Sequence, residues 1–238
     1  MKILYALLLL PFMAQAAPEV NIGSLYDYLD GNRSTSLKRV RNGGDSTAFV
    51  KVSVAEVVYD AEGKHREIPM DGMPAEQRTL IASPARLIVP AQGMQSVRLL
   101  YRGDRDRERY FRLRFIPVLP EVNDGFSVTV QQAEAYQQEL KAGLNILAGY
   151  GSMLFVRPAD TRYQTDVQQA AGRLSVVNRG NATVVLDHVN DCSSDGKQCE
   201  PATKHHLLPG SQRHFDKRPG RVYRFELIEG DASRKVEF

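Results

Sequence analysis

Apolar and polar residues alternate with a period of two along most of this chain, which is the pattern of half-buried β-strands. Residues 47–60, TAFVKVSVAEVVYD, place valines on one face and side chains such as Lys51 and Ser53 on the other. Residues 85–103, ARLIVPAQGMQSVRLLYRG, contain two such runs joined by a Pro-Ala-Gln-Gly turn. Similar runs recur about every ten residues between Gly, Pro, Asn and Asp, which predicts an all-β protein built from sandwiches.

The strand pattern is interrupted after Pro158. Residues 159–172, ADTRYQTDVQQAAG, are polar and contain no apolar run, which is typical of a linker. The alternation then resumes in RLSVVNRGNATVVLDHV and continues toward the C-terminus. We therefore predict a first β domain over residues 17–160, a linker over 161–171 and a small second β domain over 172–238.

Residues 123–143, NDGFSVTVQQAEAYQQELKAG, do not fit this pattern. They begin like a strand, with Phe126, Val128 and Val130 at a spacing of two, and then become rich in Gln, Glu and Ala. The segment is predicted to form one or two helical turns or a mobile connection. A connection of this length inside a compact domain is usually functional or disordered.

The first 16 residues have the features of a secretory signal peptide. Lys2 precedes an apolar run from Ile3 to Met13, and Ala14-Gln15-Ala16 fits a cleavage site made of small residues. The apolar run is shorter than the roughly 20 residues that span a bilayer, and no later run reaches that length. The mature protein is therefore predicted to be exported and not embedded in a membrane.

Net charge and cysteine use narrow the possible functions. The chain carries 31 Lys and Arg against 28 Asp and Glu, and its formal charge of +3 falls to +2 once Lys2 is removed. This balance argues against a nucleic-acid-binding protein, in which strongly basic patches are the norm. Cys192 and Cys199 are predicted to form a disulfide, because an exported protein meets an oxidising compartment.

Catalytic and metal-binding motifs are absent from the sequence. There is no G-x-S-x-G, H-E-x-x-H or P-loop, and Ser152 in GYGSM lacks the second glycine of a nucleophile elbow. His205, His206 and His214 have no carboxylate or cysteine at ligand spacing once the cysteines pair, so we expect exposed histidines and no metal. The protein is predicted not to be an enzyme and to need no cofactor.

Two short motifs are better explained as turns. Arg102–Asp104 is an RGD triplet within a charged run between two predicted strands, which is typical of a solvated hairpin tip. Asn181-Ala182-Thr183 fits a glycosylation sequon, but the overlapping NRGN is typical of a tight turn.

Six segments, taken in order, resemble a known family. They are LDGNRSTSLKRVRNGGDSTAFVKV, SPARLIVPAQGMQSVRLLYRG, RERYFRLRF, LFVRP, GRLSVVNRGNATVVL and LLPGSQRHF. Their order and spacing resemble the periplasmic pilus-assembly chaperones of the chaperone–usher pathway, and specifically the alternate branch that includes alpha-fimbriae and the common pilus. The resemblance covers most of the mature chain.

The resemblance implies two immunoglobulin-like β-sandwich domains in an L or boomerang. It implies a periplasmic protein that binds pilus subunits by donor-strand complementation, in which the chaperone lends a strand to an incomplete subunit, and then delivers them to an outer-membrane usher. The alternative is that the chain is itself a structural or adhesive component of a pilus. Such a subunit would lack its last strand and carry an N-terminal donor extension, whereas two complete sandwiches are predicted for this chain.

In the classical branch of the family, the donor residues alternate just before the aromatic-x-Arg-Pro that closes the strand. In this sequence that position gives Leu144, Ile146 and Ala148, upstream of LFVRP. These three side chains would share one face, because strand side chains alternate. Phe126, Val128 and Val130 have the same period. They either extend the donor surface or pack against the neighbouring strand.

The classical branch of this family also uses two basic residues in the cleft between the domains, which bind the carboxylate at the C-terminus of the pilus subunit. Here the sequence departs from the family, because the matching positions fall near Tyr26 and on Met153. Arg98, Arg112 and Arg114 lie on strands predicted to be adjacent and could replace them by bidentate pairing. The other reading is that they are solvated or form internal ion pairs.

Overall fold

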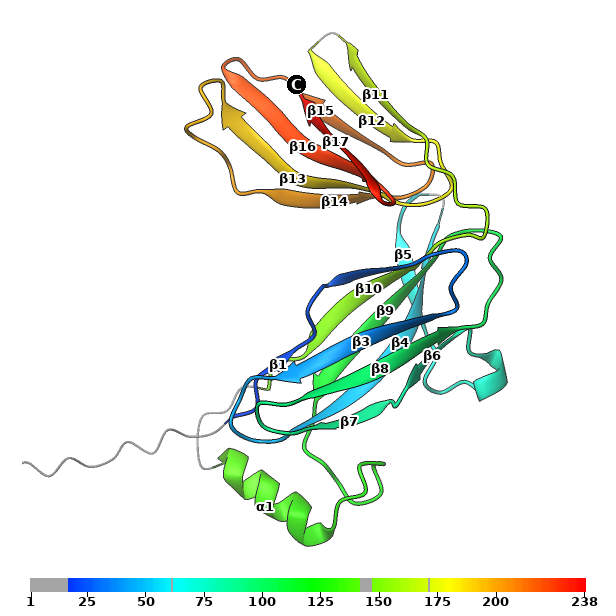
Figure 1. Ribbon diagram of the computed structural model, residues 1–238, viewed down its shortest axis with the longest axis vertical. Helices are drawn as coiled ribbons and strands as arrows, with labels where there is room; N and C mark the ends of the chain where they lie inside the picture. Colours follow the sequence, from blue (N-terminus) through cyan, green and yellow to red (C-terminus); the bar gives the residue numbers. More distant parts are fainter. Residues whose placement is uncertain (1–16, 61, 142–146, 171) are drawn as a thin grey trace, which may run out of the picture.

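The structure, a computed structural model, describes residues 17–60, 62–141, 147–170 and 172–238. It contains two β-sandwiches, one above the other in Figure 1, which meet at a narrow junction and form a bent molecule. The predicted all-β fold with two sandwich domains is confirmed. The bend agrees with the L or boomerang that the family resemblance implies.

The first sandwich packs a four-stranded sheet against a six-stranded sheet. The four-stranded sheet has the order β1 (Val20–Asn21), β3 (Thr35–Asn42), β8 (Met94–Tyr101) and β6 (Leu80–Ser83). The six-stranded sheet has the order β2 (Tyr26–Leu29), β10 (Tyr150–Val156), β9 (Arg109–Pro117), β4 (Ala48–Tyr59) and β5 (His65–Pro69), with β7 (Arg86–Val89) also paired to β4. A short 3-10 helix, η1, covers Ala75–Gln77.

Apolar side chains at every second position line the inward faces of both sheets. β4 contributes Val50 and Val52, and β9 contributes Phe111, Leu113 and Phe115, all of them almost completely buried. Burying a side chain of this size stabilises the fold by roughly 1.5–3 kcal/mol relative to leaving it in water. The alternation read from the sequence therefore marks the core directly.

The start of the chain contributes to both sheets of the first sandwich. β1 pairs with β3 in one sheet, and β2 then runs parallel to β10 in the other. Lys38 of β3 is buried, and its ammonium donates to the Ser24 carbonyl and lies 2.7 Å from a carboxylate oxygen of Asp27 on β2. A buried charge is tolerated only with such partners, so this pair fixes where the chain crosses from one sheet to the other.

The second sandwich is smaller and has its own core of Val, Leu and Phe side chains. One sheet has the order β11 (Thr165–Ala170), β12 (Arg173–Asn178) and β15 (Gln212–Asp216). The other has the order β14 (Thr203–Leu207), β13 (Val184–Ser193), β16 (Arg221–Glu229) and β17 (Ala232–Glu237). The predicted disulfide between Cys192 and Cys199 is confirmed, and it closes the turn after β13.

The predicted linker over 161–171 is too long. Thr165–Ala170 forms β11, which pairs antiparallel with β12 and belongs to the second sandwich. Its side chains are half-buried or exposed, so the strand is held mainly by backbone hydrogen bonds at the sheet edge. A strand of this kind carries no apolar run, which explains why sequence pattern took it for a linker.

The segment over 123–143 contains a longer helix than predicted, α1 (Val130–Lys141). Thr129 and Gln132 form a capping box at its start: the Gln132 amide donates to Thr129 Oγ1 at 3.2 Å, and the Thr129 amide donates to Gln132 Oε1 at 2.9 Å. Phe126 and Val128 are not in a strand, and Val130 opens the helix. The strand-like pattern of FSVTV therefore does not correspond to a strand.

The junction between the sandwiches depends on a buried carboxylate. Glu108, only 6% exposed, accepts the Thr183 backbone amide at 3.0 and 2.9 Å and the Thr183 hydroxyl. Burial raises the pKa of Glu108, and the hydrogen bonds from Thr183 oppose that rise. Thr183 lies just before β13, so this contact links the start of β9 to the second sandwich.

The charged run around the RGD triplet is only partly a solvated tip. Arg102 and Asp104 are exposed, as expected. Arg105 instead donates to the backbone carbonyls of Asp30 and Arg157, each at 2.9 Å, and therefore helps to hold the junction. The guanidinium group of a loop arginine can be held by backbone carbonyls in this way, and the pattern of residues along the sequence does not reveal such a contact.

Each sandwich carries a buried asparagine at the same place in its fold. Asn42 ends β3, and its amide nitrogen donates to the carbonyls of Ser46 and Val89 at 2.7 and 3.1 Å. Asn178 ends β12, and its amide nitrogen donates to Ala182 and Leu207 at 2.9 and 2.8 Å. Each side chain braces a buried turn whose backbone groups have no strand partner.

Replacing Asn42 by Ala should lower the free energy of unfolding by about 3 kcal/mol, because several buried backbone groups lose their hydrogen bonds. Urea unfolding followed by circular dichroism measures this change. Asn32→Ala, at an exposed turn position, is the control and should change stability by less than about 0.5 kcal/mol. A loss below about 1 kcal/mol for Asn42→Ala would show that the bracing is not needed.

Candidate functional site

Strand β10 has two different edges. β9 pairs with it from Tyr150 to Val156, whereas β2 pairs only with Met153–Val156. Within the described residues, the first part of β10, Tyr150–Ser152, therefore has no strand on the β2 side. An unpaired edge of this kind is a template for a strand from another chain.

The same part of β10 presents an aromatic side chain outside the core. Leu154 and Val156 point into the first core, and Tyr150 lies on the same face because strand side chains alternate. Tyr150 is nevertheless 36% exposed, since the core ends before it. Between them, Ser152 is buried with a hydroxyl that has no described hydrogen-bond partner. A row of core-facing positions therefore continues beyond the protein's own core.

The sequence-based site prediction missed Tyr150. The signal was present, because Tyr150 shares the parity of Leu154 and Val156 in LNILAGYGSMLFVRP. Of the predicted donor residues, Leu144 and Ile146 lie outside the described residues. Ala148 is described, exposed and two positions before Tyr150. The donor role of these three residues stays a prediction.

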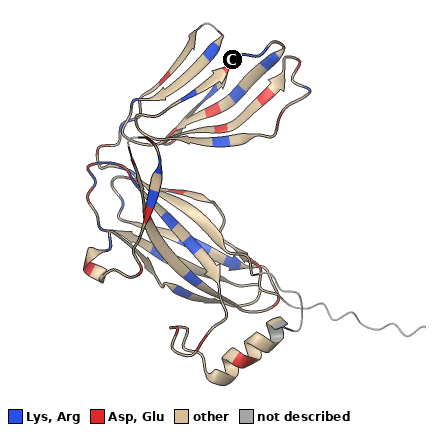
Figure 2. Ribbon diagram, turned by 180° about the vertical axis from the view of Figure 1, so that it is seen from behind, with Lys and Arg blue, Asp and Glu red and all other residues tan. Residues whose placement is uncertain are grey.

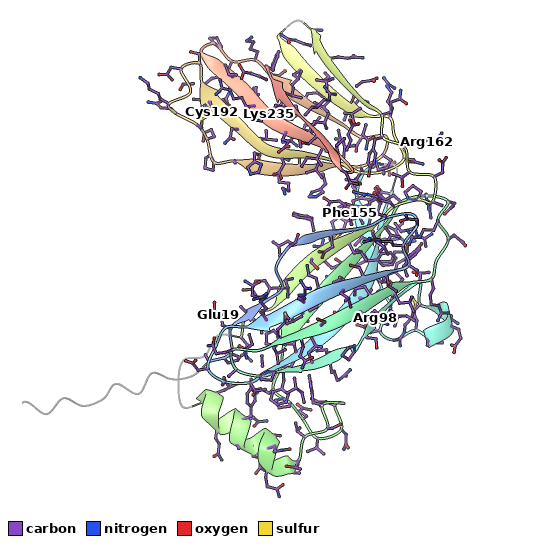
Figure 3. All side chains as sticks on the ribbon, viewed as in Figure 1. Glu19, Arg98, Phe155, Arg162, Cys192 and Lys235 are labelled. Atoms are coloured by element: carbon purple, nitrogen blue, oxygen red, sulfur yellow. A yellow bond between two sulfur atoms is a disulfide. The ribbon has the colours of Figure 1, made fainter. Side chains whose placement is uncertain are left out.

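The outward face of β10, on which Met153 and Phe155 lie, lines a cleft between the sandwiches. Met153 pairs with Tyr26 of β2, so the two positions at which the sequence departs from the family are neighbours. Phe155 lies at the junction in Figure 3. A cavity of about 350 Å³ opens here, lined by Leu25, Tyr26, Tyr59, Arg112, Gly151, Met153, Phe155, His206 and Leu208.

Arg112 is the arginine that the structure brings into this cavity. It pairs with Met153 across β9 and β10, so both side chains share the outward face. Its Nε lies 3.4 Å from a carboxylate oxygen of Glu67, whose other oxygen is 2.5 Å from Arg114. The hydrogen bond from Arg114 lowers the pKa of Glu67, which keeps that carboxylate ionised beside both arginines.

The predicted adjacency of the three arginines is wrong for Arg98. β8 belongs to the four-stranded sheet and β9 to the six-stranded sheet, so Arg98 lies on the opposite side of the sandwich from Arg112. Figure 3 shows Arg98 away from Phe155 and the cleft. Figure 2 shows basic residues spread along the strands of the first sandwich, so positive charge alone could not locate the site. β8 and β9 follow each other in the sequence but belong to different sheets, and the alternation of apolar and polar residues does not show this.

The expectation of exposed histidines is wrong for His206. Its ring stacks on Phe155 with centroids 5.0 Å apart, and its Nε2 is hydrogen-bonded to the Tyr28 hydroxyl at 2.8 Å. Burial lowers the pKa of His206 to about 4, with the positive charge of Lys204 acting in the same direction. His206 is therefore neutral at pH 7 and belongs to the wall between the domains.

The other two histidines do not contribute to this wall. His205 is half-buried on β14, and His214 is exposed with its Nδ1 2.9 Å from the Ser175 hydroxyl. Among the described residues, no group of three or more His, Cys, Asp and Glu side chains could hold a metal ion.

Comparisons with known proteins agree on one class. No family model matches the chain. It is 29% identical over 217 residues to the probable fimbrial chaperone EcpB of Klebsiella pneumoniae (strain 342). The alignment covers 90% of this chain and 88% of that protein. It is 27% identical over 202 residues to the protein of the same name from Escherichia coli (strain K12 / DH10B), over 84% of this chain and 82% of that one.

Solved structures agree in fold. The crystal structure of the class 5 fimbriae chaperone CfaA matches with a TM-score of 0.55 and 19% identity, over 92% of this chain and 98% of that chain. A chain of the complex between Salmonella enterica SafA pilin and the SafB chaperone matches with a TM-score of 0.56 and 14% identity, over 92% and 95%. In sequence the chain is similar to proteins named as fimbrial chaperones, and in fold it is similar to solved fimbrial chaperones.

The place of this chain in the alternate branch stays a prediction. In the part of the chain that the structure describes, no helix is long and apolar enough to cross a membrane.

The free energy of unfolding of this protein should fall as the pH drops from about 6.5 toward about 4. The folded pKa of His206 is about 4 and the unfolded value is 6.5, so in this window the unfolded chain binds the proton more readily. Thermal unfolding of the wild type and His206→Gln at pH 7 and pH 4.5 measures this effect.

The Gln variant should lose less melting temperature on acidification than the wild type. His214→Gln, at an exposed position, is the matched control and should behave like the wild type. An equal acid shift in wild type and His206→Gln would contradict the role assigned to this ring.

Proposed function

We propose that this protein is a periplasmic chaperone that binds pilus subunits by donor-strand complementation and delivers them to an outer-membrane usher. The observation that carries the proposal is the start of β10, where an unpaired strand edge and the exposed core-facing Tyr150 occur together. Added strands gain affinity from backbone hydrogen bonds and specificity from alternate side chains. The alternative, a structural or adhesive pilus component, is not favoured, because the matched relatives are named chaperones.

Tyr150 would be the first side chain that the chaperone shares with the subunit. An incomplete subunit exposes an apolar groove beside an unpaired edge, which would aggregate if left open. The row formed by Tyr150 and the predicted residues upstream, Leu144, Ile146 and Ala148, would fill that groove. Support for a subunit as partner comes from SafB, whose structure was solved in complex with SafA pilin.

Arg112 is the proposed anchor for the carboxylate at the C-terminus of the bound pilin. It lines the cleft cavity next to Met153, where the family resemblance implies a cation. Glu67 lies 3.4 Å from Arg112 but only 2.5 Å from Arg114, so its contact with Arg112 is the longer one. The terminal carboxylate of a pilin can therefore replace Glu67 at Arg112, while Glu67 stays paired with Arg114. Arg114 is therefore assigned to the internal ion pair.

Export follows from the same proposal. Residues 1–16 would act as the signal peptide, and the confirmed disulfide suits the oxidising periplasm. The proposed action is binding and transfer of a folded or folding partner, without catalysis.

Tyr150→Asp should abolish capture of co-expressed pilus subunits, because it places a charge in an apolar groove. The measurement is co-purification of those subunits with tagged chaperone from the periplasm. Tyr150→Phe, which keeps the ring, should retain capture.

Leu37→Asp provides the control for surface charge, because Leu37 is 62% exposed on the four-stranded sheet, away from β10. It should retain the subunits. If Tyr150→Asp still captured them while remaining folded, the assignment of β10 as the donor strand would be wrong.

Arg112→Ala should weaken pilin binding by about 2 kcal/mol, roughly thirtyfold, which is typical of one lost hydrogen bond to a charged group. The effect is measured by titration calorimetry with a peptide that reproduces the last residues of the pilin and ends in a free carboxylate, and with the amidated form of the same peptide. The free peptide should bind more tightly than the amide to the wild type, and equally to Arg112→Ala.

Arg98→Ala is the matched control, since Arg98 is exposed on the opposite sheet. It should keep the preference for the free carboxylate. Loss of that preference in Arg114→Ala but not in Arg112→Ala would move the anchor to Arg114.

A further inference from the structure

An apolar cluster lies outside both cores, on the outward face of the six-stranded sheet. We call it the Phe49 cluster. Its buried members are Phe49, Phe126, Tyr136 and Leu140, and Val118, Val128 and Leu147 are half-buried against it. It shares no residue with the core of the first sandwich. It is therefore a separate packing unit, which fixes the segment between β9 and β10 against the outside of the sheet.

Phe49 is the centre of this cluster. It points outward because its neighbour Val50 points into the core. Its ring meets Phe126 edge to face at 5.4 Å and Tyr136 of α1 at 4.9 Å between centroids. Such aromatic pairs contribute beyond the area that they bury, so Phe49 and Tyr136 define the geometry of the contact.

Polar contacts fix the segment that covers Phe49. The Val118 amide donates to the Phe49 carbonyl at 2.8 Å, which holds the chain just after β9. The Arg86 guanidinium donates to the Asp124 carbonyl in the following turn. The capping box at Thr129 then starts α1, which lies at the end of the first sandwich away from the second in Figure 1.

Leu147 connects this cluster to β10. It is half-buried in the cluster, three positions before the strand begins at Tyr150. Gly149 already lies along β9, since a Cβ placed on it would be 3.4 Å from the Phe115 carbonyl oxygen. The chain therefore passes from the Phe49 cluster directly to the edge of β9.

We infer that the Phe49 cluster positions the donor strand by setting which face it presents. With Leu147 held on the outward face, the alternate residues Ala148 and Tyr150 take the opposite face, which continues the core. A slip of one residue would exchange the two faces, because side chains alternate along a strand. Phe49 and Tyr136 are thus positioning residues, and the inference rests on the proposed donor function of β10.

The first test needs no partner. The two native cysteines are joined in a disulfide, so an introduced cysteine is the one free thiol. Leu147→Cys and Ala148→Cys are labelled with a maleimide in the wild-type and Phe49→Ala backgrounds. Loss of the Phe49 ring should raise the labelling rate of Leu147→Cys about tenfold by weakening local closure. The already exposed Ala148→Cys should label at the same rate in both.

The second test measures the consequence for binding. Phe49→Ala should reduce co-purification of co-expressed pilus subunits about tenfold, with the melting temperature of the sandwich core unchanged. Phe49→Leu should recover most of the capture. Ile88→Ala is the matched control. Ile88 lies on β7 opposite Phe49 of β4, but it is 43% exposed and is not part of the Phe49 cluster.

Four outcomes separate the possibilities. The inference is overturned if Leu147→Cys labels no faster without the Phe49 ring, or if Phe49→Ala captures subunits as well as the wild type. If Phe49→Ala does not fold, Tyr136→Ala on α1 replaces it with the same expected results. If labelling changes as expected but the wild type captures no subunit, the proposed function fails while the positioning of Leu147 stands.

Discussion

The central constraint on this molecule is that one strand, β10, is sealed in a core over one half only. Its second half is sealed between β2 and β9, with Leu154 and Val156 inside the first sandwich. Within the described residues, its first half has one unpaired edge, and it directs Tyr150 out of that core. The proposed donor role requires that this half stay extended and present one fixed face before a partner arrives.

Two anchors at opposite ends of the first sandwich meet that need. At one end, the aromatic wall of Phe155 and His206 sets the cleft against which β10 lies. At the other, the Phe49 cluster holds Leu147 just before the strand. An exposed strand with two fixed ends loses little conformational entropy when a partner pairs with it, which favours binding.

Sequence pattern predicted most of the fold, because buried alternation in strands such as β4 and β9 directly encodes their faces. It failed where backbone pairing or tertiary contacts decided the structure. β11 carries no apolar run, α1 depends on its capping box and on Phe49, and Arg98 lies on a sheet that chain order does not reveal. At the site, parity could have found Tyr150, but the choice of Arg112 required the register between β9 and β10.

The buried carboxylate of Glu108 has a consequence for binding kinetics. Its two oxygens accept three hydrogen bonds from Thr183, so the sandwiches are joined at a point where a small rotation would strand a buried charge. The opening of the cleft is therefore set before a partner arrives. Encounter should then proceed without a slow domain closure, at a rate governed by diffusion and by the salt-dependent field of the arginines along β9.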